Sequence, residues 1–553
     1  MNNRKLNDIP VIKNRDYIID IDNLGSNGEG IGRIDGFTMF VSGALPGEKV
    51  KIKAVKVGKR FGYGKLIDIL KSSNQRVERL CQYARQCGGC QLQHMSYNLQ
   101  LDFKRQLVKD AMERIGNLED VIVHDTMGME DPWHYRNKMQ FPVGMSRGKL
   151  AIGFYAPRSH NIIDMDSCHI QHSINDTIIK VVRDYINEFN IPVYDETTHK
   201  GIIRHLVSRV GFDSGEIMVI IVTNGTQLPK KDSLIKALKD NIPGLVSVVQ
   251  NVNKKKTNVV LGGQNILLWG KDHIVDSIDG LKFRISPLSF FQVNPVQTAI
   301  LYNKALEYAG LTGREVVIDA YCGIGTIALF MARKAAKVYG IEVVPEAIGD
   351  AKINALENGI HNTEFIVGQA ELVVQDMIDE GLKVDVMVVD PPRKGCDVKL
   401  LDAIIQAQPD RMVYVSCNPA TLARDLGYLS ERGYRAVEIQ PVDMFPQTAH
   451  VETVVLLSQQ KPSDRIEVDL DMDEMDVTSA ETKATYVDIK DYVLKEHGLK
   501  VSNLYISQVK RKCGLEVGEN YNLAKSEDAK QPNCPEDKEK AIEDALKHFG
   551  MIS

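Results

Sequence analysis

The sequence has no long apolar run, no apolar leader and no excess of basic residues. None of its hydrophobic stretches approaches the roughly 18 residues that a membrane helix needs, which excludes a spanning protein. The opening residues, MNNRKLNDIP, have no apolar core after their charges, so we expect no secretory signal and a cytoplasmic location. The formal net charge is −5, so binding to nucleic acid would have to come from local basic surface.

Cysteine is also scarce, with nine in 553 residues. An odd number at low density, without an export signal, argues against a disulfide framework and favours metal binding or catalysis. Cys81, Cys87 and Cys90 stand close together, and Cys168 follows at a distance. Four thiolates suit a structural zinc or a [4Fe–4S] cluster. Zinc sites usually show two CxxC pairs, and radical enzymes space their first cysteines more closely, so this spacing favours a closed, structural cluster.

The rest of the composition, 43% hydrophobic and 25% charged, is typical of a soluble globular protein. The length predicts three or four domains at roughly 150 residues each. Short strands separated by glycine-rich turns predict an OB-like β-barrel over residues 10–70, with strands at 17–21, 37–41, 50–57 and 63–70. Lysines with Phe61 and Tyr63 among them follow residues 49–65. That pattern is typical either of a solvated strand face or of a surface that follows phosphates and stacks bases.

Three further regions follow the barrel. Residues 71–285 form a mixed central domain that contains the cysteines, with a helix expected over 97–115 and strands over 215–222 and 245–251. Residues 286–460 alternate strand and helix patterns, as in a Rossmann-like parallel α/β sheet. Residues 461–553 begin with an acidic linker at 464–476 and continue as a helical extension, with helices expected at 487–496, 504–512 and 536–549. The predicted fold is therefore an α/β and β multidomain chain with a helical C-terminal extension.

A glycine-containing turn in the third region indicates a nucleotide-like cofactor. A buried-strand pattern ends at Asp319, and Tyr321, Gly323 and Gly325 lead from it into a helix. Glycines there let the backbone approach a ligand closely. The next strand ends in Glu342, an acid placed to bind ribose hydroxyls. Because the third glycine of the dinucleotide motif is missing, S-adenosylmethionine, which has no pyrophosphate, fits better.

Three more motifs follow strands of the same region. The hexapeptide DPPRKG begins at Asp390 after a buried strand, and Arg393 stands where amine-methylating enzymes have an aromatic residue, which argues against amine methylation. Cys417 follows a strand and precedes a helix, where a thiol can have a lowered pKa. Glu452 opens the last apolar strand, which favours a raised pKa and a general-base role.

Taken together, these motifs resemble those of the RNA uracil-5-methyltransferases. The resemblance covers about residues 10–460 and is greatest to the bacterial 23S rRNA (uracil-C5)-methyltransferases with an N-terminal TRAM domain. It rests on the cysteine set, on FQVN at Phe291, on the turn after Asp319, on DPPRKG at Asp390, on SCNP at Ser416 and on HVET at His450.

The resemblance implies a role for each motif. It implies a [4Fe–4S] cluster on Cys81, Cys87, Cys90 and Cys168, and S-adenosylmethionine contacts at Gln292, Tyr321, Glu342 and Asp390. Cys417 matches the nucleophile and Glu452 the base. Arg136 and Phe290 match positions that handle RNA near the target base. The implied activity is 5-methylation of uridine in 23S rRNA by a monomer that has no membrane partner.

Three alternatives stay open at this point. The RNA could be tRNA instead of rRNA. The chain could be a non-catalytic RNA-binding or ribosome-assembly protein, although intact Cys417, Glu452 and Asp390 weigh against that. An iron–sulfur redox protein is disfavoured by the closed cysteine set.

Overall fold

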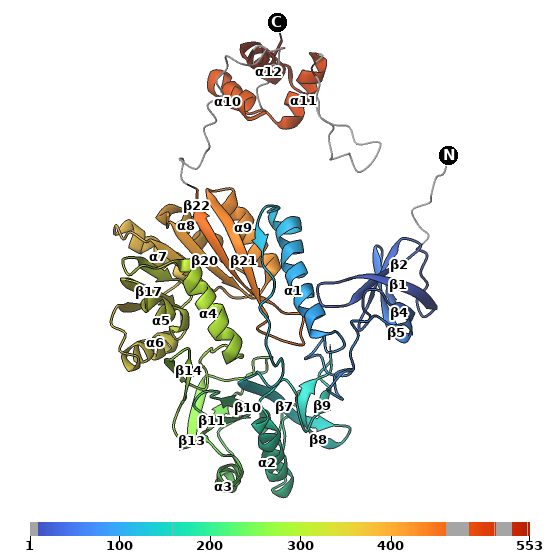
Figure 1. Cartoon of the computed structure of the whole chain (residues 1–553), viewed down its shortest axis with the longest axis vertical. Coiled ribbons are helices and arrows are strands. Elements are labelled where there is room, and N and C mark those ends of the chain that lie inside the picture. The colour runs from blue at the N-terminus through green and yellow to red at the C-terminus, as the bar shows by residue number, and fades with distance from the viewer. Residues whose placement is uncertain are drawn as a thin grey trace. The chain divides into compact units, whose positions relative to one another are not determined.

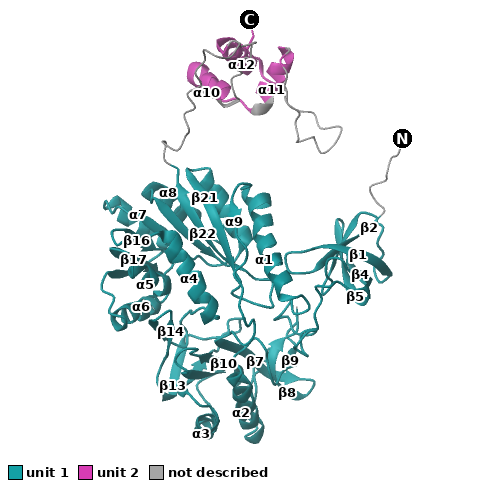
Figure 2. Ribbon diagram, in the orientation of Figure 1, with its two compact units in different colours: residues 1–464 teal, residues 465–553 magenta. Residues whose placement is uncertain are grey.

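The computed structural model describes residues 9–157, 159–460, 486–513, 515, 534–549 and 551–552. The chain divides into two compact units, Met1–Asp464 and Arg465–Ser553 (Figure 2). The acidic linker expected at 464–476 lies outside the described residues. No described helix is long and apolar enough to cross a membrane.

The first strands of the chain form the barrel that the sequence predicts (Figure 1). The strands are β1 (Asp16–Leu24), β2 (Gly30–Ile34), β3 (Phe37–Val41), β4 (Lys49–Val57) and β5 (Phe61–Lys71). They form a closed barrel in the order β1-β2-β3-β5-β4. Strand β2 lies in one of the glycine-rich stretches that the sequence pattern predicts to be turns between strands. A Cβ at Gly32 would lie 2.3 Å from the carbonyl oxygen of Asp20, so this glycine allows close approach of β1 rather than a turn.

The central region combines one long helix with a mixed sheet. Helix α1 (Tyr97–Ala111) continues into a π-helical turn (Met112–Gly116). A seven-stranded sheet has the order β13-β12-β11-β10-β7-β8-β9. Its strands are β7 (Lys138–Ser146), β8 (Lys149–Tyr155), β9 (Ile162–Asp164), β10 (Ile203–Val210), β11 (Ile217–Thr223), β12 (Leu245–Val252) and β13 (Gln264–Gly270), and its helices are α2 (Ile174–Glu188) and α3 (Lys231–Asn241). The hairpin β14 (Ile274–Ile278) and β15 (Leu281–Ile285) leads out of this region.

An eight-stranded sheet follows, in the order β18-β17-β16-β19-β20-β22-β21-β6. Its strands are β6 (Ile122–Val123), β16 (Val316–Asp319), β17 (Lys337–Glu342), β18 (Thr363–Val367), β19 (Val386–Val389), β20 (Arg411–Ser416), β21 (Tyr434–Val442) and β22 (Glu452–Gln459). The expectation of a parallel sheet is only partly met, because β22 runs antiparallel to both β20 and β21. This arrangement brings the start of β22 to the edge where β20 ends.

Alternate residues of this sheet enter two separate cores. Val317, Val338 and Val413 pack with one set of helices, whereas Ile318, Ile341 and Met412 pack with the other. Helices on the first face are α4 (Pro295–Ala309), α5 (Thr326–Ala332) and α6 (Pro345–Glu357). Helices on the second face are α7 (Ala370–Asp379), α8 (Val398–Ala407), α9 (Pro419–Ser430) and α1. The sheet is thus doubly wound, and its ligand site is expected at the carboxyl ends of the strands.

The second unit contains the three helices expected in the extension. These are α10 (Tyr486–His497), α11 (Asn503–Lys512) and α12 (Glu536–His548). Ile489, Val493, Ile506 and Ile542 are fully buried among them, so this unit has a hydrophobic core of its own.

Candidate active site and RNA-facing surfaces

Two carboxyl groups, one buried and one partly buried, mark the point where the strand order of the sheet reverses. Strand β16 lies between β17 and β19, and Asp319 ends β16 while Asp390 directly follows β19. Burial raises the pKa of each carboxyl group to about 7, and the charge of Asp390 adds to the rise at Asp319. The Asp319 oxygens have no hydrogen bond of good geometry to any described residue. The backbone N–H groups of Tyr321 and Ala328 nevertheless lie near them and oppose the rise in the pKa of this carboxyl group. Such a crevice is where doubly wound sheets bind small ligands.

The turn after β16 has free space beside it and is hydrogen-bonded to Glu342, the predicted ribose-binding acid. Gly323 and Gly325 have φ values of +54° and +83°, and a Cβ at Gly323 would meet no other atom within 4 Å. The Gly323 N–H donates to Glu342 Oε2 over 3.3 Å, and the Val344 N–H donates to Glu342 Oε1 over 3.0 Å. The Glu342 carboxylate is therefore fixed beside the turn.

Gln292 reaches this crevice from outside the sheet. Its side chain bonds to Tyr302, whose phenol also feels the charges of Asp390 and Asp319. The Asn137 side chain donates to the Gln292 carbonyl over 2.9 Å, which ties the start of β7 to this segment. Tyr321 lies on the other face, beside Asp397 and Glu371, and burial raises the pKa of its phenol.

Cys417 lies between the ends of β20 and β22. Its loop is held by the Arg393 carbonyl, which accepts from Asn418 Nδ2 at 3.0 Å and from Thr421 Oγ1 at 3.2 Å. Burial raises the pKa of the thiol to about 11, the charges of Glu452 and Asp390 add to the rise, and Arg393 opposes it. The lowered thiol pKa expected from the helix N-terminus is wrong, because the effects of burial and of two carboxyl groups exceed those of Arg393 and of the Cys417 backbone.

Glu452 faces the thiol from the first position of β22. Thr453 pairs with Ser416 across the two antiparallel strands, so Glu452 and Cys417 are brought together at the same end of the sheet. The Glu452 side chain is 4% exposed, and burial raises its pKa well above the ordinary value, with Asp390 adding and Arg393 opposing. The raised pKa predicted for Glu452 is confirmed in direction. A carboxyl group with a raised pKa beside a thiol can exchange protons with a bound substrate.

Basic side chains extend the site toward the central sheet. His450 lies near Arg393, Lys104 and Arg136, and burial together with these cations lowers its pKa. Arg136 also lies near Lys138, whose pKa burial lowers to about 7 with help from Arg209 and Arg136. Arg136 is thus part of a row of cations that starts beside Cys417.

Phe290 projects from a loop that is fixed at its base. The ring is 71% exposed, although its neighbours Ser289 and Phe291 are buried. The buried guanidinium of Arg209 donates to the carbonyl oxygens of Pro287 and Ser289. The Ser289 hydroxyl donates to Asp350 over 2.9 Å. An exposed aromatic ring on a rigid base is suited to stacking on an unpaired nucleobase.

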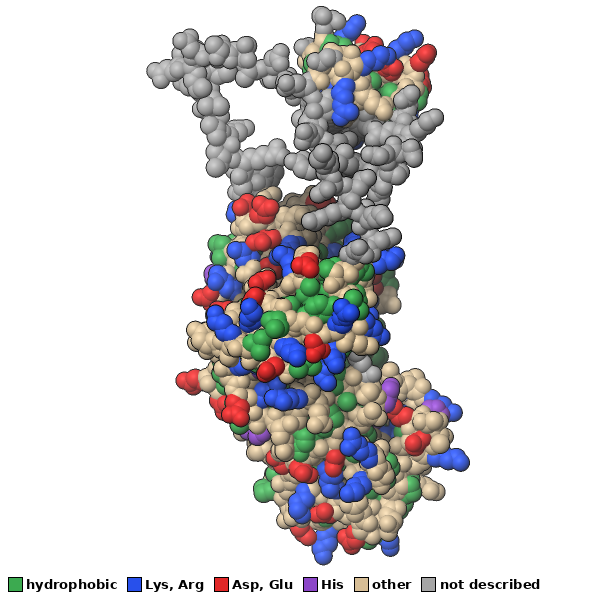
Figure 3. Space-filling model, turned by 90° about the vertical axis from the view of Figure 1, so that its right-hand side faces the viewer, with side chains coloured by type: hydrophobic (Ala, Val, Ile, Leu, Met, Phe, Trp, Pro, Cys, Tyr) green, Lys and Arg blue, Asp and Glu red, His purple; other side chains and the backbone are tan. Residues whose placement is uncertain are grey.

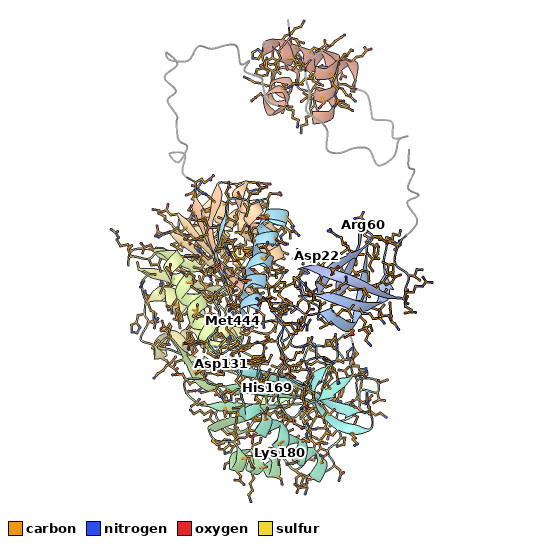
Figure 4. All side chains as sticks on the ribbon, turned by 45° about the vertical axis from the view of Figure 1, so that its right-hand side comes forward. Asp22, Arg60, Asp131, His169, Lys180 and Met444 are labelled. Atoms are coloured by element: carbon orange, nitrogen blue, oxygen red, sulfur yellow. The ribbon has the colours of Figure 1, made fainter. Side chains whose placement is uncertain are left out.

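The barrel presents a second aromatic surface. Ring centroids of Phe40, Phe61 and Tyr63 lie 5.6 to 5.8 Å apart, and Phe61 is 45% exposed. The Lys56 ammonium lies 5.9 Å from the Tyr63 centroid. Within the described part of the chain, four neighbouring cations have no ion pair: Lys56, Lys59, Arg60 and Lys65 (Arg60 is labelled on the barrel in Figure 4). On the face drawn in Figure 3, basic and acidic side chains are interspersed, so neither sign of charge dominates that face.

The predicted metal-binding cysteines line one cavity. Cys81, Cys87, Cys90 and Cys168 surround it together with Ala84, Gly89, Gln93, Phe154, Met165, His169 and Ile170. Burial raises the pKa of Cys90 to about 12 and that of Cys168 to about 11, and the neighbouring thiols add to both rises. Among the described residues, no three His, Cys, Asp or Glu side chains gather closely enough to hold a single ion. The ring of thiols with a largely apolar wall fits a group that bonds each sulfur at a separate metal atom.

Several polar residues around the site have no signal in the sequence. Lys104 and Asp443 form a fully buried ion pair, and the Tyr97 hydroxyl donates to Asp443 over 2.8 Å. Gln100 bonds to Gln447. The partners in these contacts are more than 300 positions apart, which no local pattern can reveal.

Comparison with known proteins agrees with this geometry. A family model for tRNA (uracil-5-)-methyltransferases matches residues 96–460, and a TRAM domain model matches residues 13–67. An uncharacterized RNA methyltransferase of Clostridium tetani is 56% identical over 451 residues, which cover 82% of this chain and 98% of the relative. Another, from Halalkalibacterium halodurans, is 53% identical over 448 residues, which cover 81% of this chain and 98% of the relative.

A solved structure has the same arrangement of elements. The tRNA (uracil-54, C5)-methyltransferase of Pyrococcus abyssi, in complex with S-adenosyl-L-homocysteine, superposes with a TM-score of 0.64 at 28% identity. The match covers 79% of this chain and 99% of that one. These similarities confirm the resemblance found in the motifs, and the chain belongs to the tRNA (uracil-5-)-methyltransferase family.

Proposed function

We propose that this protein is an S-adenosylmethionine-dependent methyltransferase that forms 5-methyluridine in 23S rRNA through a covalent bond to Cys417. The observation that carries the proposal is the mutual electrostatic contact of Cys417, Glu452, Asp390 and Arg393 at the carboxyl ends of the sheet. This set contains a nucleophile, an acid with a raised pKa and a cation, and C5 methylation of uracil needs the first two.

S-adenosylmethionine would supply an electrophilic methyl group at the switch point. We assign its contacts to Gln292, Tyr321, Glu342 and Asp390. The fit rests on three features of the crevice: the open turn at Gly323, the Glu342 carboxylate fixed beside it, and the buried Asp319 carboxyl group at the end of β16.

The chemistry requires two protein groups in sequence. The C5 atom of uracil is too weak a nucleophile to attack a sulfonium methyl group. As the Cys417 sulfur adds to C6, the thiol proton passes to the uracil O4, and the resulting enol makes C5 nucleophilic. After methylation C5 carries both a methyl group and a hydrogen. The carboxylate form of Glu452 then accepts that proton, the C5=C6 bond re-forms and the C6–S bond breaks, and the released thiolate regains a proton from Glu452.

The cations and Phe290 would handle the RNA. A uracil inside a helix cannot reach Cys417, so the target base must be turned out of its stack. Arg136 lies close enough to the site to meet the displaced nucleotide, and Phe290 would stack on a neighbouring base. The unpaired barrel cations and the Phe40, Phe61 and Tyr63 rings would bind more distant nucleotides.

We assign a [4Fe–4S] cluster to Cys81, Cys87, Cys90 and Cys168. The support is the single cavity that all four thiols line. Bound there, the cluster would stabilise the fold by cross-linking the segment 81–90 to Cys168. We infer no redox step in the reaction.

The RNA target has two candidates. The TRAM barrel and the motif set resemble the 23S rRNA enzymes, and this is the support for rRNA. A tRNA target is favoured by the similarity to the Pyrococcus enzyme, which is a tRNA methyltransferase. The match covers 99% of that enzyme's chain, so the fold that the two proteins share does not by itself select rRNA. We place the reaction in the cytoplasm and assign it to a monomer.

Mapping of 5-methyluridine decides between the candidates. Purified 23S rRNA and tRNA from cells with and without this protein would be digested and read by mass spectrometry. We expect 5-methyluridine to disappear from one or more 23S rRNA positions. Loss from tRNA alone would transfer the proposal to tRNA, and no loss from either would contradict uridine methylation.

A further inference from the structure

The loop 443–451, which joins β21 to Glu452 of β22, is held by many polar contacts (Met444 of this loop is labelled in Figure 4). Lys104 Nζ donates to the Phe445 carbonyl over 3.0 Å, and the Tyr135 hydroxyl donates to the Pro446 carbonyl over 3.0 Å. From α4, the Asn294 side chain donates to the Met444 carbonyl and the Gln297 side chain to the Asp443 carbonyl, both over 3.1 Å. The loop is thus held at several points along its length, and Glu452 is the first residue after it.

Gln447 is the point where the loop turns. It is 3% exposed and has a φ of +70°, a conformation that non-glycine residues adopt only when the surroundings enforce it. Gln100 of α1 supplies that enforcement. The Gln447 N–H donates to Gln100 Oε1 over 3.0 Å, and Gln100 Nε2 donates to Gln447 Oε1 over 3.1 Å.

The same residue is tied to the cysteine segment. The Leu92 N–H donates to the Gln447 carbonyl over 3.0 Å. The Ala449 N–H donates to Gln91 Oε1 over 3.4 Å. Gln91 and Leu92 directly follow Cys90, so the backbone that leaves the thiol cavity is hydrogen-bonded to the loop that ends at Glu452.

We propose that Gln100 and Gln447 are positioning residues for Glu452, and that through them the segment 81–92 sets the location of this carboxyl group relative to Cys417. This inference rests on the general-base role assigned above to Glu452. Glu452 opens its strand, so one side of its position is fixed by the ladder to Val442 and the other by the loop. Loss of the Gln100 contact would free the loop that precedes Glu452, while Cys417, which directly follows β20, would stay in place.

The test is Gln100→Leu, with Gln106→Leu on the exposed side of the same helix as the matched control. Misplacement of a reacting group by about 1 Å can cost about a hundredfold in rate. We therefore expect turnover to fall about ten- to a hundredfold in Gln100→Leu alone. Addition to C6 and methylation should continue, so the methylated protein–RNA adduct should accumulate on denaturing gels with methyl-labelled S-adenosylmethionine. A merely destabilised enzyme would lose adduct and product in equal measure.

A second variant and a second readout keep the test independent of folding. Gln447→Gly suits the positive φ but removes the side-chain bond, so it should fold and show the same accumulation of adduct. Hydrogen exchange of backbone amides 443–452 should become faster in both variants, while β16 stays protected. The same increase should follow removal of iron from the assigned cluster in the parent protein.

The outcomes separate this inference from the proposed function. If Glu452→Gln accumulates adduct but Gln100→Leu and Gln447→Gly behave like Gln106→Leu, the positioning role is wrong. Unchanged exchange of 443–452 after iron removal would contradict the link to the cysteine segment. If no adduct forms even with Glu452→Gln, the proposed function itself fails.

Discussion

Cys417, the proposed nucleophile, is kept protonated by its surroundings. Burial, Glu452 and Asp390 raise its pKa to about 11, so at neutral pH the resting group is a thiol. The thiolate then has to form as the substrate arrives, which protects the residue from unwanted alkylation and oxidation.

The pKa of Cys417 predicts how its alkylation depends on pH. Labelling by iodoacetamide, followed by peptide mass spectrometry, should still rise about tenfold per pH unit between pH 8 and 9.5, whereas an ordinary thiol levels off near about 8.5. Asp390→Asn should speed labelling at pH 9, since it removes a charge that raises the pKa, and Arg393→Gln should slow it. A rate that levels off below pH 8 would contradict the assigned environment.

Phe290 should matter for RNA and not for folding. Its ring is 71% exposed, so Phe290→Ala should leave the free energy of unfolding within about 0.5 kcal/mol of the parent. Loss of one stacked base should weaken RNA binding by about 1–3 kcal/mol. Leu288→Ala in the same loop, at 46% exposure, is the control for lost apolar area. Equal effects of the two changes on the Kd for RNA would argue against stacking.

At the scale of elements, long-range polar contacts fix the active-site loops. Lys104 of α1 and Asp443 after β21 form an ion pair in which both side chains are fully buried. Removing one partner of such a pair leaves an uncompensated charge and costs about 3–5 kcal/mol. Lys104→Met should therefore lower the free energy of unfolding of the first unit by that amount.

A double variant shows whether the charge is the cause. Lys104→Met combined with Asp443→Leu should recover part of the loss in urea unfolding, because no charge is then left unpaired. If the double variant is less stable than Lys104→Met by a further several kcal/mol, packing rather than charge explains the first result.

The elements and the site differ in how well the sequence predicts them. Strand periodicity locates the strands that end at Asp319, Glu342 and Ser416, because hydrophobic runs and turn residues are local. The sequence alone could not show that the pKa of Cys417 is raised. The rise depends in part on Glu452, which is 35 positions away in sequence and beside the thiol in space. The hydrogen-bonded pair of Gln100 and Gln447 joins two polar residues that have no distinctive sequence pattern, so only the fold identifies the pair.

At the scale of the whole molecule, the chain contains a part that matches a known enzyme family and a second unit that lies outside that match. The family match ends at residue 460, and α10, α11 and α12 lie beyond it with a core of their own. Within the first unit, the thiol cavity brings Cys168 beside the segment 81–90, which leads into α1.

The assigned cluster has a direct chemical signature. Anaerobically purified protein should be brown and contain about four irons per chain, as a [4Fe–4S] cluster requires. Cys87→Ser should reduce the yield of folded protein more than the activity of each folded molecule. Stoichiometric zinc without iron would contradict the cluster.

The central claim is that Cys417 and Glu452 act at opposite ends of one covalent cycle, and one gel experiment tests it. Glu452→Gln protein would be incubated with substrate RNA and methyl-labelled S-adenosylmethionine, then separated under denaturing conditions. Turnover should fall roughly 10²- to 10⁴-fold, the usual contribution of a positioned base, and a slow band of protein, RNA and labelled methyl group should accumulate. Cys417→Ala should give neither band nor product. Normal turnover by Glu452→Gln, or a labelled band from Cys417→Ala, would contradict the assigned roles.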